Sequence, residues 1–180
     1  MRTKFTAFVA ASVDGRISLD PGKSPDWTSR EDQIFFRNAL SKFDAVVMGW
    51  STFEAARKNM EKRTTFVLSS RPGNPVREKF FNGGSARQGS FVTFVNPLRA
   101  HLRDIFGKFK TVAVLGGGRV YQTMLDEKLM DEIYVTVEPL IFGQGIPMFV
   151  GGASTAHLRL VSVEKLNKIG TVLLHYKIRK

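Results

Sequence analysis

Three consecutive glycines, Gly116, Gly117 and Gly118, stand between an apolar run and an amphipathic run, and Arg119 follows them directly. The residues before them are typical of a buried strand, and those after them recur at helical spacing: Val112, Val114 and Leu115, then Val120, Tyr121, Met124 and Leu125. Glycine lets another molecule approach the backbone closely, and the N-terminus of a helix favours an anion. The junction therefore predicts a phosphate-binding turn.

The glycine run is open to two other interpretations. A tight strand-to-helix turn that binds nothing would use the same residues. The dinucleotide fingerprint G-x-G-x-x-G is not met, because its sixth position is Tyr121, although Glu138 lies roughly 20 residues on, where an acid that binds ribose is expected. The motif alone therefore does not decide the ligand.

Two further junctions carry small, hydroxyl or basic residues directly after a predicted strand. They are Gly49–Thr52 and Ser69–Arg71. Ligands of open α/β sheets bind outside the carboxyl ends of the strands, where such junctions meet. Because three junctions agree, a ligand that carries phosphate is favoured over an empty turn.

The composition is that of one ordinary globular domain over residues 1–180, with 43% hydrophobic and 24% charged residues. No apolar run approaches the ~18 residues of a membrane span, and we expect neither membrane association nor a signal peptide. The absence of cysteine excludes disulfides and favours the cytoplasm. The three histidines, His101, His157 and His175, lack the spacing of metal ligands, so no metal site is expected.

The formal net charge of +11 predicts an anionic partner. Nucleic acid and a multiply phosphorylated small molecule both satisfy that condition. The basic residues are dispersed along the chain, and few aromatic residues interleave with them as a nucleic-acid stacking surface requires. A small-molecule substrate is therefore expected, and no nucleic acid.

The order of predicted elements defines the fold class. Strands alternate with helices over the first 130 residues, and consecutive strands follow. The predicted strands are 5–11, 44–49, 64–68, 91–95, 111–115 and 132–137, followed by a hairpin of 158–166 with 171–178. The predicted helices are 30–41, 97–106, one that ends at Arg57 and one that follows the glycines. This order predicts an α/β fold with a mostly parallel central sheet, helices on both faces and an antiparallel C-terminal edge.

Three connecting segments are long. Residues 12–27 form an irregular stretch that we interpret as a lid or binding loop, and residues 138–153 form another. The third, residues 74–89, is polar and rich in glycine, and no element is assigned to it.

The helix after the first loop has two possible capping frames, Thr28 with Glu31 or Ser29 with Asp32.

At this point the motifs resemble those of the dihydrofolate reductases. Val114–Tyr121 resembles their glycine turn, which holds the cofactor pyrophosphate, and Met48–Glu54 resembles the segment that grips the adenosine side of NADPH. Leu68–Gly73 resembles the segment that reaches the 2′-phosphate. The order and spacing of these motifs extend over nearly the whole chain, and they imply the three-layer fold of that superfamily.

Other segments resemble a sister branch, the pyrimidine reductase of riboflavin biosynthesis, often found as the C-terminal half of a deaminase–reductase. These segments are Ala11–Ile17, Asp44–Gly49 and Pro139–Phe149. Without cysteine there is no zinc deaminase module, so the resemblance implies a stand-alone reductase. It also implies a homodimer, and hydride transfer to a pyrimidine- or pterin-type ring.

The resemblance assigns a cofactor site for NADPH, with NADH less favoured. The glycine turn would bind the diphosphate through Leu115, Gly116, Gly117, Gly118, Arg119, Val120 and Tyr121. The two other junctions would bind the adenosine side through Gly49, Trp50, Ser51, Thr52, Leu68, Ser69, Ser70 and Arg71. Two small residues, Ala10 and Ala11, would lie beside the nicotinamide. The protein would orient the cofactor, which carries the redox chemistry.

The resemblance also places a carboxylate on the helix after the first loop, where it anchors the heterocycle and assists protonation. Counting back from Arg37-Asn38 gives Glu31, with Asp32 beside it, and both are also explained as helix-capping acids. Ser12, Asp14 and Trp27 are candidate substrate contacts, and for Asp14 the alternative is a purely structural turn.

The chain departs from its relatives at two positions. Trp50 stands where dihydrofolate reductases carry the arginine that pairs with the 2′-phosphate, and Arg71 is a candidate replacement. Gly116 stands where pyrimidine reductases commonly have glutamate. Two alternatives therefore remain beside the pyrimidine reductase: dihydrofolate reductase activity, and a basic non-catalytic protein that binds nucleotide or nucleic acid.

Overall fold

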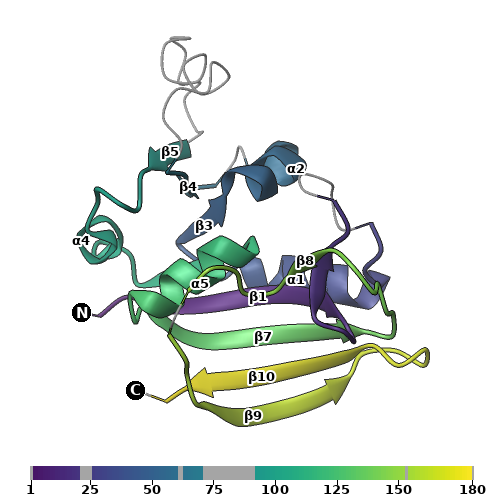
Figure 1. Cartoon of the computed structure of the whole chain (residues 1–180). Helices are drawn as coiled ribbons and strands as arrows, with labels where there is room; N and C mark the ends of the chain where they lie inside the picture. The colour runs from purple at the N-terminus through teal and green to yellow at the C-terminus, as the bar shows by residue number, and fades with distance from the viewer. Residues whose placement is uncertain (1, 21–25, 61–62, 71–91, 153, 180) are drawn as a thin grey trace.

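A computed structural model describes residues 2–20, 26–60, 63–70, 92–152 and 154–179, and shows the predicted α/β architecture (Figure 1). An eight-stranded sheet runs in the order β5-β4-β3-β6-β1-β7-β10-β9. The first six of these strands run parallel to one another. Their carboxyl ends consequently meet on one side of the molecule.

The strands of this sheet are rich in β-branched and aliphatic residues, as buried parallel strands require. Their bounds are β1 Lys4–Ser12, β3 Ala45–Gly49, β4 Thr65–Leu68, β5 Val92–Val95, β6 Thr111–Val114, β7 Met130–Glu138, β9 Leu158–Lys165 and β10 Val172–Ile178. A second, two-stranded sheet pairs β2 (Arg16–Ser18) with β8 (Ile146–Pro147). It ties the first long loop to the second.

Helices cover both faces of the sheet and make it a three-layer structure. On one face lie α4 (Leu102–Phe106) and α5 (Gly118–Asp126), packed on Val9, Val114 and Ile133. On the other face lie α1 (Arg30–Leu40) and α2 (Trp50–Met60), which enclose an aromatic core around Phe8 and Phe53. The predicted fold class is therefore confirmed.

The C-terminal hairpin also forms as predicted. Strand β10 pairs antiparallel with β7, with Leu174 opposite Val135, and β9 continues the sheet as its last strand. The connection 166–171 is closed by Asn167, whose side-chain oxygen accepts the backbone N–H groups of Gly170 and Thr171. The hairpin is thus part of the main sheet and not a separate subdomain.

The structure corrects two local expectations and decides between the two capping frames. The helix expected over 97–106 begins only at Leu102, because residues 97–100 form turns instead. The second of the two capping frames is the one used: Ser29 is the N-cap, and its hydroxyl accepts the backbone N–H of Asp32 at 3.3 Å. The long loops were expected to be irregular, yet each contributes one strand to the β2–β8 pair.

Candidate functional site

A cavity of about 1160 Å³ opens at the carboxyl edge of the parallel strands. It is bounded by the ends of β1, β3 and β4, by the starts of α2 and α5, and by the inner side of α1. Described residues from all three predicted junctions line it, namely Gly49–Thr52, Leu68–Ser70 and Leu115–Tyr121. Its size exceeds what a drug-sized ligand needs, so it has room for a dinucleotide and a second molecule.

The glycine turn is held against the end of β3. The backbone N–H of Gly49 donates to the carbonyl oxygen of Gly116 at 2.6 Å, and the peptide bond between Gly116 and Gly117 is cis. Gly116 has φ +97°, which disfavours any residue with a Cβ, and a Cβ there would also meet the Tyr121 hydroxyl at 2.9 Å. Gly116 is therefore required by the turn itself.

Gly117 and Gly118 differ in the space around them. A Cβ on Gly118 would lie 2.6 Å from the carbonyl oxygen of Pro147, so this glycine allows the second long loop to cross the start of α5. A Cβ on Gly117 would meet only the Thr52 hydroxyl, at 3.7 Å. Gly117 is the N-cap of α5 and has no side-chain cap, so its neighbourhood is open toward the cavity at the positive end of a helix.

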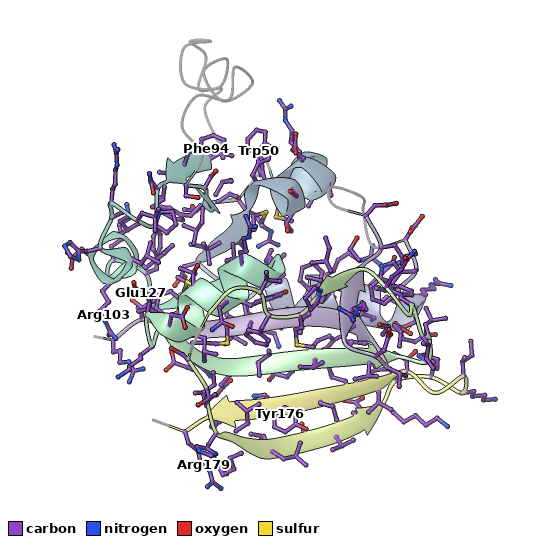
Figure 2. All side chains as sticks on the ribbon, viewed as in Figure 1. Trp50, Phe94, Arg103, Glu127, Tyr176 and Arg179 are labelled. Carbon is purple, nitrogen blue, oxygen red and sulfur yellow. The ribbon has the colours of Figure 1, made fainter. Side chains whose placement is uncertain are left out.

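Trp50, which lines the cavity at the start of α2, belongs to an aromatic cluster. The Trp50 ring lies 5.9 Å from Phe94 and 6.2 Å from Phe53, and Figure 2 shows Trp50 and Phe94 near each other beside the start of α2. Leu68, Ser69 and Ser70 follow at the end of β4 and line the same cavity. Arg71, the predicted partner of a 2′-phosphate, lies outside the described residues.

Asp32 is the buried carboxylate of the cavity, with 8% of its surface exposed. Burial raises its pKa above the ordinary value, and the nearby Glu138 adds to this, whereas hydrogen bonds from the side chains of Thr136 and Thr28 oppose it. Helix α1 places Asp32 in its first turn, where it faces the end of β7. A carboxyl group in this setting can hold a proton at higher pH than an exposed one.

Glu31, the neighbouring candidate, has a different position. It is exposed, does not line the cavity, and accepts a hydrogen bond from the Asn167 side chain at 3.3 Å. Consecutive helical residues point about 100° apart, so only one of the two can face the sheet. The Ser29 cap sets the helix so that Asp32 is that residue.

The two candidate alanines of β1 lie on opposite faces of the sheet. Ala10 lines the cavity and pairs in register with Thr136 of β7, so it lies beside the residue that hydrogen-bonds Asp32. Ala11 is buried, points to the opposite face of the sheet and does not line the cavity. The predicted nicotinamide and heterocycle contacts, Ala10 and Asp32, are thereby brought together on one face.

The three candidate substrate contacts gather outside the cavity lining. The Ser12 hydroxyl donates to Asp14 at 2.6 Å, and Asp14 accepts the backbone N–H groups of Phe142 and Gly143. The Trp27 ring stands edge-on to Phe142 at 5.1 Å. These residues join the two long loops to each other.

This anchoring gives a pH-dependent prediction for Asp14. Hydrogen bonds from Ser12 and Phe142 lower its pKa from 3.8 to about 2. A lowered carboxyl pKa means that the stabilisation is present above the ordinary value and disappears as the pH falls toward about 2. We expect Asp14→Ala to melt at a lower temperature than the wild type at neutral pH, with the difference shrinking in acid. A constant difference from pH 7 to pH 2 would contradict the anchoring role.

Several cavity residues had no motif in the sequence that identified them. Phe8, Phe35 and Tyr134 form its apolar wall, Thr136 contacts Asp32, and Arg37 and Arg63 add positive charge at the lining. Tyr134 and Thr136 are two residues apart in β7, and residues two apart in a strand point to the same face of the sheet. This spacing could have predicted that the two side chains share a face. The arginines carry no such signal, because basic residues are frequent throughout the chain.

The described residues contain neither a candidate metal site nor a candidate membrane span. Within them, no group of three histidine, aspartate or glutamate side chains is arranged to hold a metal ion. None of the helices in this part of the chain combines the length and hydrophobicity needed to cross a bilayer.

The fold and the cavity define an α/β protein of the dihydrofolate reductase-like class. The chain belongs to the RibD C-terminal domain family, whose family model matches residues 3–171, and this is a family of oxidoreductases. A curated relative, the dihydrofolate reductase of Haemophilus influenzae, is 30% identical over 133 residues, which cover 73% of this chain and 70% of that protein.

Two solved structures show the same fold. A pyrimidine reductase-like protein from Corynebacterium diphtheriae has a TM-score of 0.77 at 18% identity and covers 99% of this chain and 92% of its own. The dihydrofolate reductase of Enterococcus faecalis, complexed with NADP(H) and RAB-propyl, has a TM-score of 0.62 at 21% identity, and the match covers 98% of this chain and 97% of that chain. The match to the RibD C-terminal domain family confirms the branch of the superfamily that the sequence motifs resemble.

Proposed function

We propose that this protein is an NADPH-dependent reductase that transfers a hydride to a pyrimidine-type substrate, and that its activity resembles that of 5-amino-6-(5-phosphoribosylamino)uracil reductase. One observation carries the proposal: a single cavity joins the glycine turn at the start of α5 to the buried carboxyl of Asp32. Membership of the RibD C-terminal domain family supports the substrate class.

The residues present fit a dinucleotide. Gly117 leaves open space at a helix N-terminus, Arg119 adds positive charge there, and Thr52 presents a hydroxyl 3.7 Å from the position of a Gly117 Cβ. Backbone N–H groups and a nearby cation are what a diphosphate requires. Trp50 offers a flat apolar surface at the far end in place of the charge that an arginine would supply. When bound, the nicotinamide supplies the hydride.

Asp32 would orient the substrate ring and hold a proton beside it. The ionised carboxylate can accept a ring N–H and an exocyclic amine of a pyrimidine or pterin. Its raised pKa lets the group take up a proton at a higher pH than an exposed carboxyl would, and that protonated form can then donate to the substrate. The Thr136 and Thr28 side chains hydrogen-bond the carboxyl and fix its orientation. The small side chain of Ala10, on the strand next to Thr136, leaves room for the nicotinamide ring to approach the substrate.

The walls of the cavity would exclude water from the reacting atoms. Phe8 stacks on Tyr134 with ring centroids 5.3 Å apart, and Phe35 lies 5.5 Å from Tyr134. From the other side, Ile17 and Ile146 of the β2–β8 pair and Val150 also line the cavity. A low-dielectric surrounding strengthens the electrostatic contacts that orient the substrate.

Dihydrofolate is the second candidate substrate, favoured by the 30% identity to the Haemophilus influenzae dihydrofolate reductase. The experiment compares the rates at which NADPH is oxidised in the presence of 5-amino-6-(5-phosphoribosylamino)uracil and of dihydrofolate. We expect turnover with the ribosylaminopyrimidine. Turnover with dihydrofolate alone would select the second candidate, and binding of NADPH without turnover on either would overturn the substrate assignment.

A further inference from the structure

Glu138 is a buried carboxyl group at the end of β7, with 3% of its surface exposed. Its Oε1 accepts the backbone N–H of Ser29 at 2.7 Å, and its Oε2 accepts the hydroxyl of Thr171 at 2.6 Å. Both oxygens accept, which suits the ionised form of a carboxyl group, because that form has no proton to donate. Within the described residues, hydrogen bonds and not an ion pair hold this group in place.

The first of these contacts reaches the helix that carries Asp32. Ser29 is the N-cap of α1, and its own hydroxyl accepts the backbone N–H of Asp32 at 3.3 Å. Glu138 and Thr136 are two residues apart in β7, so their side chains point to the same face of the sheet. Thr136 hydrogen-bonds the Asp32 carboxyl from that face. Glu138 and Asp32 are consequently neighbours at the start of α1.

The second contact reaches the C-terminal hairpin, which turns back beside the end of β7 (Figure 1). Thr171 is buried, and its hydroxyl also accepts the side-chain N–H of Asn167 at 2.8 Å. Asn167 in turn closes the hairpin by accepting two backbone N–H groups. A continuous set of hydrogen bonds therefore runs from the hairpin turn through Thr171 and Glu138 to the N-terminus of α1.

We propose that Glu138 is a positioning residue for Asp32, which fixes the start of α1 against the hairpin and keeps a negative charge beside the carboxyl that faces the cavity. Anchoring alone does not require that charge, because a neutral amide can accept the Ser29 N–H at a smaller desolvation cost. Burial is the main cause of the raised pKa of Asp32, and the charge of Glu138 is a further cause. The consequence for turnover rests on the proposed function, whereas the effect on Asp32 does not.

The other charged groups near this pair lie on α1 and in the first long loop. Glu31 is exposed and contacts the hairpin turn. Asp14 bonds the serine that lies in register with Glu138, and its Oδ2 is 4.0 Å from Nε of Arg16. Of these groups, Glu138 is the one whose charge raises the pKa of Asp32. The remaining charged residues of the cavity lining are Asp20, Asp26, Arg37, Arg63 and Arg119.

Glu138→Gln removes the charge and retains the anchor. The amide oxygen can accept the Ser29 N–H, and the amide NH₂ group can donate to the Thr171 hydroxyl. The ¹³C resonance of the Asp32 carboxyl, identified by its absence in Asp32→Asn, is titrated in the protein without cofactor or substrate. We expect the pKa of Asp32 to be lower in Glu138→Gln than in the wild type, because its ionised form no longer faces a second negative charge. An unchanged pKa would overturn the proposal.

Glu31→Gln is the matched control, since it removes the same charge from the first turn of α1 at an exposed position. It should lower the pKa of Asp32 by less than Glu138→Gln does, because water and salt screen an exposed charge. An equal effect of the two variants would show that Asp32 responds to the total charge of the region, and it would overturn the specific pairing with Glu138.

Thr171→Val tests the anchor without changing any charge. Valine has nearly the same shape but no hydroxyl, so Glu138 loses one donor and Asn167 loses one acceptor in a buried place. We expect a lower melting temperature than that of the wild type, and faster hydrogen exchange of the Ser29 amide. Wild-type values of both would show that the hairpin does not hold the start of α1, and would overturn the anchoring part of the proposal.

The pH profile of turnover separates this inference from the proposed function. If Asp32 donates a proton in the reaction, turnover falls as the pH rises through its pKa, and Glu138→Gln should move that fall to lower pH. A variant with a purely structural defect would lose turnover without moving the profile. If the pKa of Asp32 changed in the resonance titration while the profile stayed in place, or if the wild type gave no turnover, the proposed function would be contradicted and the pairing of Glu138 with Asp32 would stand.

Discussion

Replacing Gly117 with aspartate is expected to abolish most of the affinity for NADPH while the chain remains folded. Gly117 has φ −74° and an extended ψ, and its Cβ position is open, so aspartate fits without backbone strain. Aspartate is also a preferred N-cap residue and should stabilise α5. The added carboxylate would occupy the phosphate position at the helix N-terminus. Losing one charge-assisted contact of ~1.5–3 kcal/mol corresponds to about 10–150-fold in Kd.

Two matched variants separate charge from bulk and from folding. Gly117→Ala adds the Cβ without the charge, so it should retain more affinity for NADPH than the aspartate variant. Gly118→Ala should instead lower the melting temperature, because its Cβ would meet the Pro147 carbonyl oxygen at 2.6 Å. Titration calorimetry with NADPH and thermal melts of all three variants provide the measurements. Wild-type affinity in Gly117→Asp would show that the glycine turn does not bind phosphate.

The second large effect is expected from Asp32→Asn. Asparagine preserves the shape of the side chain but cannot supply a proton in the same way or accept from two donors. General acid–base contributions are worth about 10²–10⁴-fold, and turnover should fall within that range. The affinity for NADPH should be unchanged, because Asp32 lies beside Thr136 and away from the glycine turn. Glu31→Gln is the control, since Glu31 is exposed and outside the cavity lining, and its turnover should be that of the wild type.

Although Asp32→Asn is expected to lower turnover, it is expected to raise the stability of the folded protein. Burial raises the pKa of Asp32 in the folded state, so the folded protein binds this proton more tightly than the unfolded chain does. Stability then falls as the pH rises from the ordinary carboxyl pKa through the raised one, and stays reduced above it. Asp32→Asn removes this cost, and its advantage in melting temperature should grow over that pH range. A variant that is less stable than the wild type at neutral pH would contradict a carboxyl held at a desolvation cost.

The sequence allowed the three strand-end junctions that line the cavity to be located. Gly49, Leu68 and Gly116 each end an apolar run, and parallel strands must bring such ends to one edge. Local pattern and topology agree there, so the junctions meet in one cavity as expected. Asp32 and Glu31 could not be separated in the same way, because the two capping frames differ by one residue and only the packed helix reveals which carboxylate faces the sheet.

Other features depend on contacts between distant segments and have no local signal. Asp14 bonds the backbone at Phe142 and Gly143, so its anchoring role follows from a tertiary contact across 128 residues. Thr136 contacts Asp32 from another element, and its position in β7 alone does not predict that partner. The early helix start expected at Pro97 was wrong, because proline is equally compatible with the turn that precedes Leu102.

The most direct measurement of the central claim follows a deuterium label from NADPH into product. NADPH deuterated at the transferable position is mixed with excess enzyme and 5-amino-6-(5-phosphoribosylamino)uracil, and the product is analysed by mass spectrometry after a single turnover. The proposed function predicts a product that carries the label with wild-type protein, and strongly reduced labelling with Asp32→Asn and Gly117→Asp. Formation of unlabelled product, or full labelling by the Gly117→Asp variant, would contradict hydride transfer from a cofactor bound at the glycine turn.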